Sequence, residues 1–268
     1  MTNVFVSVDQ VETPARFIDV RFNLMDKNEG QAQYEKEHIA GAVYFDLERD
    51  LSDMSKKDGR HPMPEKAQLI NLFESAGLQL TDVIYVYDQG GAPFAPRAWW
   101  MLNYAGFENV SIVNGGYDAL KKAGYATTSN KESFDRSTIT ANWQENTYAD
   151  RDYVKAITEG KVDAMLLDAR AAIRYRGEQE PLDPVAGHIP TAKNFDWEQV
   201  KDGNQLVVTE TLRNAVASHK EVVVYCGSGV TASPLYTVLK EAGHENVKLY
   251  VGSYSDWITK YEVATGEE

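Results

Sequence analysis

Residues 222–232 read VVVYCGSGVTA, and this stretch decides the fold. Three valines and a tyrosine form the short apolar, β-branched and aromatic run that is typical of a strand buried on both faces. The strand predicted over 222–225 ends at Cys226, a glycine-containing loop follows, and a helix is predicted over 234–242. That helix ends at an Ala-Gly step, where glycine supplies a left-handed C-cap. Strand, loop and helix in this order predict a parallel α/β sheet, with the loop at the carboxyl end of a strand, where such sheets bind ligands.

The chain repeats itself. Residues 83–88 read VIYVYD and match the strand at 222–226, and three more pairs of segments match: FIDVR at 17–21 with LLDAR at 166–170, HIAGA at 38–42 with HIPTA at 188–192, and AGFENV at 105–110 with AGHENV at 242–247. The first copy carries about a dozen extra residues, which we place in the polar stretch 46–64. The predicted fold class is therefore α/β, with two homologous tandem domains, each a mainly parallel sheet with helices on both faces.

The predicted domain boundaries follow the repeat. The first domain is expected over residues 1–126 and the second over 147–268, and the polar stretch 127–146 between them suits a linker. Asp150 is expected to cap the first helix of the second domain.

Composition narrows the class of protein. There are 27 Lys+Arg against 40 Asp+Glu, a net charge of −13, and one cysteine in 268 residues. The acidic surplus argues against nucleic acid or an anionic membrane as the partner, and no apolar run approaches the ~20 residues of a membrane span. A lone cysteine excludes a disulfide scaffold within the chain. With no sign of a signal peptide at the N-terminus, a cytoplasmic, reducing location is expected.

The single cysteine is the candidate nucleophile. Gly227 and Gly229 allow the loop backbone to point successive N–H groups inward, and the helix that follows adds the positive end of its dipole. Both effects favour a thiolate over a thiol, and the hydroxyls of Ser228 and Thr231 are further donors. A buried structural cysteine is the alternative, but the position at a strand end favours chemistry. The first copy has Asp88 at the equivalent position, so that domain is expected to have lost the chemistry.

These segments together resemble the rhodanese family, and more closely its tandem-domain sulfurtransferases, in which an inactive N-terminal domain precedes an active C-terminal one. The resemblance covers nearly the whole chain and includes, besides the repeated segments, HPMP at 61–64, APRAWWM at 95–101 and the Gly-Gly of 115–116. It implies that Cys226 accepts a sulfane sulfur as a persulfide and passes it to a second acceptor. The loop that would stabilise the persulfide consists of Gly227, Ser228, Gly229, Val230 and Thr231.

The loop also indicates the sulfur donor. The thiosulfate branch of the family has basic residues directly after the cysteine, whereas Gly227 and Ser228 are neutral, as in the 3-mercaptopyruvate branch. In that branch one arginine binds the donor carboxylate, and Arg174 matches it. A second arginine of the branch follows a Glu-Pro step, where this chain has Leu182. Arg176 is a weaker candidate for that contact, with an ordinary surface arginine as the alternative.

Other residues carry weaker claims. His38 is a possible proton-transfer residue by resemblance, although the repeated His38 and His188 are better explained as fold determinants. Since both copies keep them, Asp168 with Arg170 and Asp19 with Arg21 are predicted to be buried structural ion pairs. Arg97 and His61 are expected to support the interface between the domains.

No metal is expected, because the five histidines have no ligand spacing, and no cofactor is implied. The expected partners are a small-molecule sulfur donor and a thiol acceptor such as thioredoxin or a small thiol, or cyanide in the test tube.

Three other classes of protein share parts of this pattern. A thiosulfate sulfurtransferase and a non-catalytic sulfur-carrier or partner-binding module stay open. A phosphatase or arsenate reductase on the same fold needs an arginine six residues after the cysteine, where this chain has Ala232. The missing oxyanion clamp argues strongly against that class.

Overall fold

A computed structural model describes residues 3–267, and they form two compact units. Unit 1 contains the chain up to Asp53, then Pro64–Gln144 and Asp202–Leu206, and unit 2 contains Met54–Met63, Glu145–Lys201 and the chain from Val207 on. Each unit thus follows one copy of the repeat, apart from two short segments. Segment 54–63 belongs to the first copy but packs in unit 2, and segment 202–206 belongs to the second copy but packs in unit 1.

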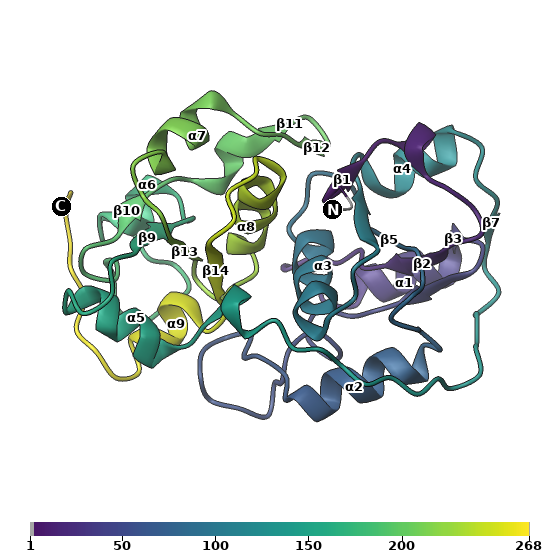
Figure 1. The fold of residues 1–268 in the computed structure, drawn as a ribbon, viewed down its shortest axis with the longest axis horizontal. Helices are drawn as coiled ribbons and strands as arrows, with labels where there is room; N and C mark the ends of the chain where they lie inside the picture. Colours follow the sequence, from purple (N-terminus) through teal and green to yellow (C-terminus); the bar gives the residue numbers. More distant parts are fainter. Residues whose placement is uncertain (1–2, 268) are drawn as a thin grey trace. The chain divides into compact units, whose positions relative to one another are not determined.

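The core of unit 1 is a five-stranded sheet, drawn with its flanking helices in Figure 1. All neighbouring strands in it are parallel, and their spatial order is β1 (Phe5–Val6), β6 (Val110–Val113), β5 (Ile84–Tyr87), β2 (Arg16–Asp19) and β4 (Ala42–Tyr44). A separate antiparallel pair joins β3 (His38–Ile39) to β7 (Thr127–Thr128). The central strand β5 is wholly buried, as its apolar run predicts.

Unit 2 repeats this sheet. Its strands are also all parallel, in the order β10 (Lys193–Asn194), β9 (Met165–Asp168), β13 (Val222–Tyr225), β14 (Val247–Tyr250) and β8 (Tyr148–Ala149). The strand predicted over 222–225 is confirmed as β13, and all four of its residues are buried. A two-stranded hairpin, β11 (Lys201–Asp202) with β12 (Gln205–Leu206), carries segment 202–206.

Helices flank both sheets, so the predicted α/β class is confirmed. Those of unit 1 are α1 (Glu29–Lys36), α2 (Lys66–Ser75), α3 (Phe94–Ala105) and α4 (Gly116–Lys122), and those of unit 2 are α5 (Arg151–Thr158), α6 (Ala172–Tyr175), α7 (Glu210–Val216), α8 (Ala232–Glu241) and α9 (Ser253–Trp257). The predicted cap is present, because Asp150 accepts a hydrogen bond from the backbone N–H of Tyr153 at the start of α5. None of the helices within residues 3–267 has the length and apolar character needed to cross a bilayer.

The two sheets are anchored in the same way. Tyr87, the last residue of β5, accepts a hydrogen bond on its hydroxyl from the backbone N–H of Ile39 at 3.2 Å. Tyr225, the last residue of β13, does the same with Ile189, also at 3.2 Å. Both tyrosines are fully buried, so each hydroxyl needs this partner. The anchor fixes the end of each central strand and therefore the start of the loop that follows it.

The polar stretch 127–146 does not leave unit 1 at once. Ser137 donates its backbone N–H to the oxygen of Glu74 at 3.0 Å, and Asn142 donates to Ala105 at the same distance. The stretch is therefore held along unit 1 by hydrogen bonds, and the chain enters unit 2 at Glu145.

Candidate active site

Cys226 lies directly after β13, at the carboxyl edge of the sheet of unit 2, and its side chain is buried. Its backbone is fixed by α9: the Cys226 N–H donates to Ser253 Oγ at 3.1 Å, and the Cys226 oxygen accepts from the N–H of Tyr254 at 3.0 Å. The N–H of Gly229 points at the sulfur, 3.1 Å from Sγ. A backbone donor is therefore aimed at the atom that would carry negative charge as a thiolate or a persulfide.

The shape of the loop depends on Gly229. Its φ is +74°, and a Cβ built there would lie 2.2 Å from the backbone oxygen of Val251. No side chain fits that position, and only glycine adopts the conformation without strain. The turn at Gly229 thus brings its own N–H back towards Cys226.

Ser228 faces a histidine. His61 Nδ1 lies 2.8 Å from Ser228 Oγ, and both residues are buried. His61 is in segment 54–63, so this contact lies within unit 2. Ser228 lies two residues after Cys226, and a hydroxyl and an imidazole at hydrogen-bonding distance are a pair of groups that can exchange a proton.

Two guanidinium groups lie over Gly227. A Cβ built on Gly227 would be 2.3 Å from Nη2 of Arg60 and 3.4 Å from Nη2 of Arg174. The absence of a side chain at position 227 therefore allows both arginines to approach the backbone next to Cys226. Two guanidinium groups that converge beside a nucleophile can bind a carboxylate.

Buried carboxylates orient these arginines. Arg174 donates from Nε to Glu180 Oε2 at 3.0 Å and from Nη2 to Glu180 Oε1 at 2.7 Å. Arg60 binds Asp183 in the same bidentate way, at 3.0 and 3.2 Å. Burial alone would raise the pKa of Glu180, but the hydrogen bonds from Arg174 and from the N–H groups of Leu182 and Asp183 lower the pKa overall.

The cluster is electrically balanced. Arg170 Nη1 also reaches Glu180, at 3.2 Å, so the ion pairs form one network next to the loop. Its members are the guanidinium groups of Arg60, Arg170 and Arg174 and the carboxylates of Asp168, Glu180 and Asp183. In the part of the chain that the structure describes, Arg60 and Arg174 donate hydrogen bonds to carboxylates from Nε and Nη2 and none from Nη1, so each has further N–H groups for a ligand.

The Asp–Arg pairs that both copies of the repeat carry are buried. Arg170 contacts Asp168 at 2.6 Å, with both side chains 0% exposed, and Arg21 contacts Asp19 at 2.6 Å in unit 1. Each arginine also donates to a backbone oxygen, that of Gly187 or of Glu37, at 2.7 Å. Identical geometry in both units, only one of which has a cysteine, favours the structural reading of these pairs.

His38 and His188 make corresponding contacts in the two units. His38 is fully buried in unit 1, donates from Nδ1 to the backbone oxygen of Tyr34 at 2.7 Å and stacks on that ring at 3.8 Å. His188 makes the same two contacts with Tyr175, at 2.8 Å and 3.8 Å. The structure therefore brings His61, and not His188, to the Cys226 loop.

The other predicted residues have contacts of their own. Arg176 pairs with Glu178 at 2.6 Å on a partly exposed surface. Arg97 is buried in unit 1, where it donates to the backbone oxygen of Leu51 at 2.8 Å. Val230 and Thr231 connect the loop to α8. Thr231 occupies the N-cap position of that helix, but its side chain makes no capping hydrogen bond.

In the first copy of the repeat, the loop after β5 binds the side chain of Asp88. Asp88 accepts hydrogen bonds from the N–H groups of Gly90 at 2.7 Å and Ala95 at 3.0 Å. Burial raises the pKa of Asp88 to about 6, although these hydrogen bonds oppose the rise. The carboxylate of Asp88 thus occupies the position to which the loop N–H groups point. Segment 202–206 packs against this loop: Asn204 lies beside Gly90 and Gly91, and its side chain donates to the backbone oxygen of Gly115 at 3.3 Å.

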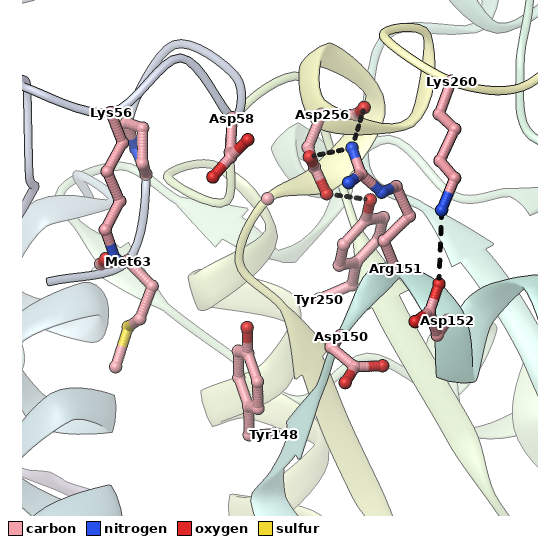
Figure 2. A pocket seen from close by; sticks show the side chains of 12 residues that line it. Lys56, Asp58, Met63, Tyr148, Asp150, Arg151, Asp152, Tyr250, Asp256 and Lys260 are labelled. Carbon is pink, nitrogen blue, oxygen red and sulfur yellow. Dashed lines mark hydrogen bonds and ion pairs between the residues drawn. The ribbon is translucent and has the colours of Figure 1, made fainter. Parts of the chain in front are cut away.

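A separate cavity of about 280 Å³ lies in unit 2 and is shown in Figure 2. Segment 54–63 contributes Lys56, Asp58, Pro62 and Met63 to its lining, but Cys226 and Arg174 do not line it. Asp256 inside it accepts from Tyr250 at 2.5 Å and from Arg151 at 2.8 Å. Among residues 3–267 no three His, Cys, Asp or Glu side chains are grouped so that they could hold a metal ion.

Sequence reasoning missed Arg60, Asp183 and the contact of His61 with the loop. One signal was available: the extra stretch of the first copy carries Arg60 and His61 side by side, in a segment that the second copy lacks. Nothing in the order of residues shows that this segment packs with Cys226, because the partners are more than a hundred residues apart.

Comparison with known proteins identifies the family. Residues 8–123 and 150–260 both match the family model of the rhodanese-like domain. The chain is 39% identical over 262 residues to a probable 3-mercaptopyruvate sulfurtransferase of Pseudomonas aeruginosa, covering 93% of this chain and 92% of that protein. It is 35% identical over 255 residues to a putative thiosulfate sulfurtransferase of Mycobacterium tuberculosis, covering 92% and 89%.

A solved structure has the same fold. The crystal structure of SseA from Escherichia coli, a 3-mercaptopyruvate sulfotransferase, superposes with a TM-score of 0.81 and 30% sequence identity, covering 95% of this chain and 100% of that one.

Proposed function

Because the chain belongs to the rhodanese family and is a sulfurtransferase, we propose that it takes sulfane sulfur from 3-mercaptopyruvate, holds it as a Cys226 persulfide and passes it to a thiol. The observation that carries the proposal is the pair of guanidinium groups over Gly227, next to the nucleophile. A 2-oxo acid with one carboxylate and a thiol fits this arrangement, since the arginines bind the carboxylate while the sulfur lies towards Cys226.

In the first half-reaction, the Cys226 thiolate attacks the donor sulfur. A sulfur–sulfur bond forms, the carbon–sulfur bond breaks, and its electron pair leaves with the pyruvate enolate. The proton that the donor thiol gives up ends on the methyl carbon of pyruvate, so that no external acid is consumed. We assign the transfer of this proton to Ser228 and His61, on the strength of their 2.8 Å contact, rather than to His38.

In the second half-reaction, an acceptor thiolate attacks the outer sulfur of the Cys226 persulfide. A sulfur–sulfur bond forms between the acceptor and the outer sulfur, and the bond between the outer sulfur and Cys226 Sγ breaks. The products are an acceptor persulfide and the Cys226 thiolate. The Gly229 N–H, 3.1 Å from Sγ, supports the assignment of the loop as the site that stabilises both anions. The sulfur donor in this class of enzyme is a small molecule and the acceptor is a thiol. We propose thioredoxin or a small thiol as the acceptor, in a reducing cytoplasm where the single cysteine stays reduced.

Thiosulfate is the second candidate donor, because one relative at 35% identity carries that name. It is a dianion, whereas the ion-pair network contains as many carboxylates as guanidinium groups. The balance of charge therefore favours the donor with a single carboxylate.

The test compares the two donors on one preparation. Incubation with 3-mercaptopyruvate should release pyruvate and add one sulfur atom to Cys226 by mass spectrometry, and Cys226→Ser should abolish both signals. Lys155→Gln, at a partly exposed position of α5, is the control and should keep the wild-type rate. Release of thiocyanate from thiosulfate and cyanide, without pyruvate release from 3-mercaptopyruvate, would move the protein to the thiosulfate class.

A further inference from the structure

Segment 54–63 carries two groups to the Cys226 loop, although it comes from the other copy of the repeat. The segment closes on itself where Lys56 Nζ donates to the backbone oxygen of Met63 at 2.9 Å, a pair of residues seen together in Figure 2. One side of it lines the cavity of Figure 2, and the other side presents Arg60 and His61 to the loop. Something must hold the segment in this register.

One anchor joins the segment to α9. The backbone N–H of Arg60 donates to Ser255 Oγ at 3.1 Å, and a Cβ built on Gly59 would lie 2.7 Å from the same oxygen. This anchor fixes the backbone of the segment but not the guanidinium of Arg60, which has several rotatable bonds between its backbone and its charge.

Asp183 fixes the guanidinium. Its two oxygens accept from Nε and Nη2 of Arg60 at 3.0 and 3.2 Å, and Oδ2 also lies 3.4 Å from Nη2 of Arg174. The Asp183 side chain is 2% exposed, whereas that of Arg60 is 31% exposed and that of Arg174 is 19% exposed. A buried carboxylate needs paired cations, and Asp183 is the one carboxylate, among the contacts described here, that binds both arginines.

Its neighbour points elsewhere. Leu182 is 58% exposed, so the chain turns the side chain of residue 182 outward and that of residue 183 inward. The turn is held by Glu180 Oε1, which accepts from the N–H groups of Leu182 at 3.0 Å and Asp183 at 3.2 Å. The inward position of Asp183 is therefore built into the loop that also orients Arg174 through Glu180.

We propose that Asp183 is a positioning residue that sets the spacing of Arg60 and Arg174 over Gly227 and, through Arg60, holds His61 at Ser228. It touches no reacting atom. This inference rests on the proposed function for its kinetic consequence, but the order of segment 54–63 that it requires is independent of which donor is used.

The experiment uses the full chain and two substitutions, Asp183→Asn and Asp183→Glu. The amide removes the charge and replaces one acceptor by a donor, so Arg60 loses its bidentate partner. The KM for 3-mercaptopyruvate should rise at least tenfold, and hydrogen exchange of peptides covering residues 54–63 should accelerate at least tenfold. The glutamate retains the charge and should recover a part of both. Glu198→Gln, which removes a 55% exposed carboxylate from an ion pair in the same unit, is the matched control and should change neither.

A double substitution separates positioning from general stability. If Asp183 acts through the two arginines, Asp183→Asn should raise the KM in an Arg60→Ala background by less than half the factor seen in the wild-type background, because only the contact with Arg174 is then left to lose. Full additivity of the two effects, or wild-type exchange in residues 54–63 of Asp183→Asn, would overturn the inference. If the wild-type protein releases no pyruvate, the proposed donor is wrong, and the exchange measurement on correctly folded Asp183→Asn still decides whether Asp183 holds the segment.

Discussion

Gly227 and Gly229 flank Ser228, and the molecule needs them for different reasons. At Gly229 the backbone has a φ of +74° and the position of a Cβ is filled by the backbone of Val251. At Gly227 the φ is not positive, and the nearest atom to a built Cβ is the far end of the Arg60 side chain. Gly227 therefore leaves room for the arginine side chains, whereas Gly229 is required by the conformation of the loop itself.

Substitution at position 227 should separate binding from folding. In Gly227→Ala the Cβ displaces the Arg60 guanidinium, which can move, so we expect a thermal midpoint within about 2 °C of wild type. Loss of one charge-assisted hydrogen bond to the donor costs about 1.5–3 kcal/mol, so the KM for 3-mercaptopyruvate should rise roughly 10- to 100-fold. The measurements are steady-state kinetics and calorimetry.

Gly229→Ala is the contrasting variant. A left-handed alanine costs about 1–2 kcal/mol before the clash with Val251 is counted, so this variant should lose both stability and activity. If Gly227→Ala lowers the thermal midpoint as much as Gly229→Ala does, the Arg60 side chain does not move aside to make room for the new Cβ, and the expectation is wrong.

At the scale of elements, the loops after β5 and β13 solve the same problem with different groups. Both follow a strand anchored by a buried tyrosine hydroxyl. After β13 a backbone N–H points at a sulfur, and after β5 two N–H groups bind the Asp88 carboxylate. In the loop after β5 the backbone N–H groups thus bind a carboxylate of the chain itself.

This carboxylate makes the stability of unit 1 depend on pH. The folded-state pKa of Asp88 is about 6, above the ~4 of an aspartate in an unfolded chain, so the folded state binds the proton more tightly. The contribution to stability is fully present below pH ~4 and is lost as the pH rises through 6. Wild type should therefore lose on the order of 3 kcal/mol relative to Asp88→Asn between pH 4 and pH 7.5.

Chemical denaturation of the two proteins across that range measures the difference. A constant offset between them at every pH would show that Asp88 titrates as an ordinary exposed carboxylate. The comparison cancels the other titrating groups, because both proteins share them.

The elements also show what the sequence can predict. The strand at 222–225 is found with the predicted bounds, because a short β-branched run between turn residues has few alternatives. The Cys226 loop was predictable for the same local reason. Arg60 and Asp183 were not, because their pairing depends on how segment 54–63 packs, and no local pattern encodes a contact 123 residues apart.

At the scale of the whole molecule, the repeat is not a pair of self-contained halves. Segment 54–63 joins unit 2, and segment 202–206 joins unit 1, where Leu206 accepts from Asn114 Nδ2 at 2.8 Å and donates to its Oδ1 at 2.9 Å. Each half of the sequence therefore supplies a piece of the other unit.

A chain cut between the sequence halves should expose this dependence. Residues 147–268 contain Cys226, Arg174 and Asp183 but lack Arg60 and His61. Expressed alone, they should turn over 3-mercaptopyruvate at least ~100-fold more slowly. Arg60, which we propose binds the donor carboxylate, and His61, which we propose transfers the proton, are both missing. Co-expression with residues 1–146 should restore activity in proportion to the complex formed, which gel filtration measures. Wild-type turnover by residues 147–268 alone would show that segment 54–63 is dispensable.

The loop after β5 in unit 1 is covered by the turn of Gly203 and Asn204. A Cβ at Gly90 would meet Asn204 at 3.1 Å, and one at Gly91 would meet the Asn204 backbone at the same distance, so the chain itself occupies the space beside these two glycines. Replacing Asp88 with cysteine would therefore supply a thiol without supplying access to it. Engineering a second reactive cysteine into this protein would take two changes, one at residue 88 and one in the turn that covers its loop.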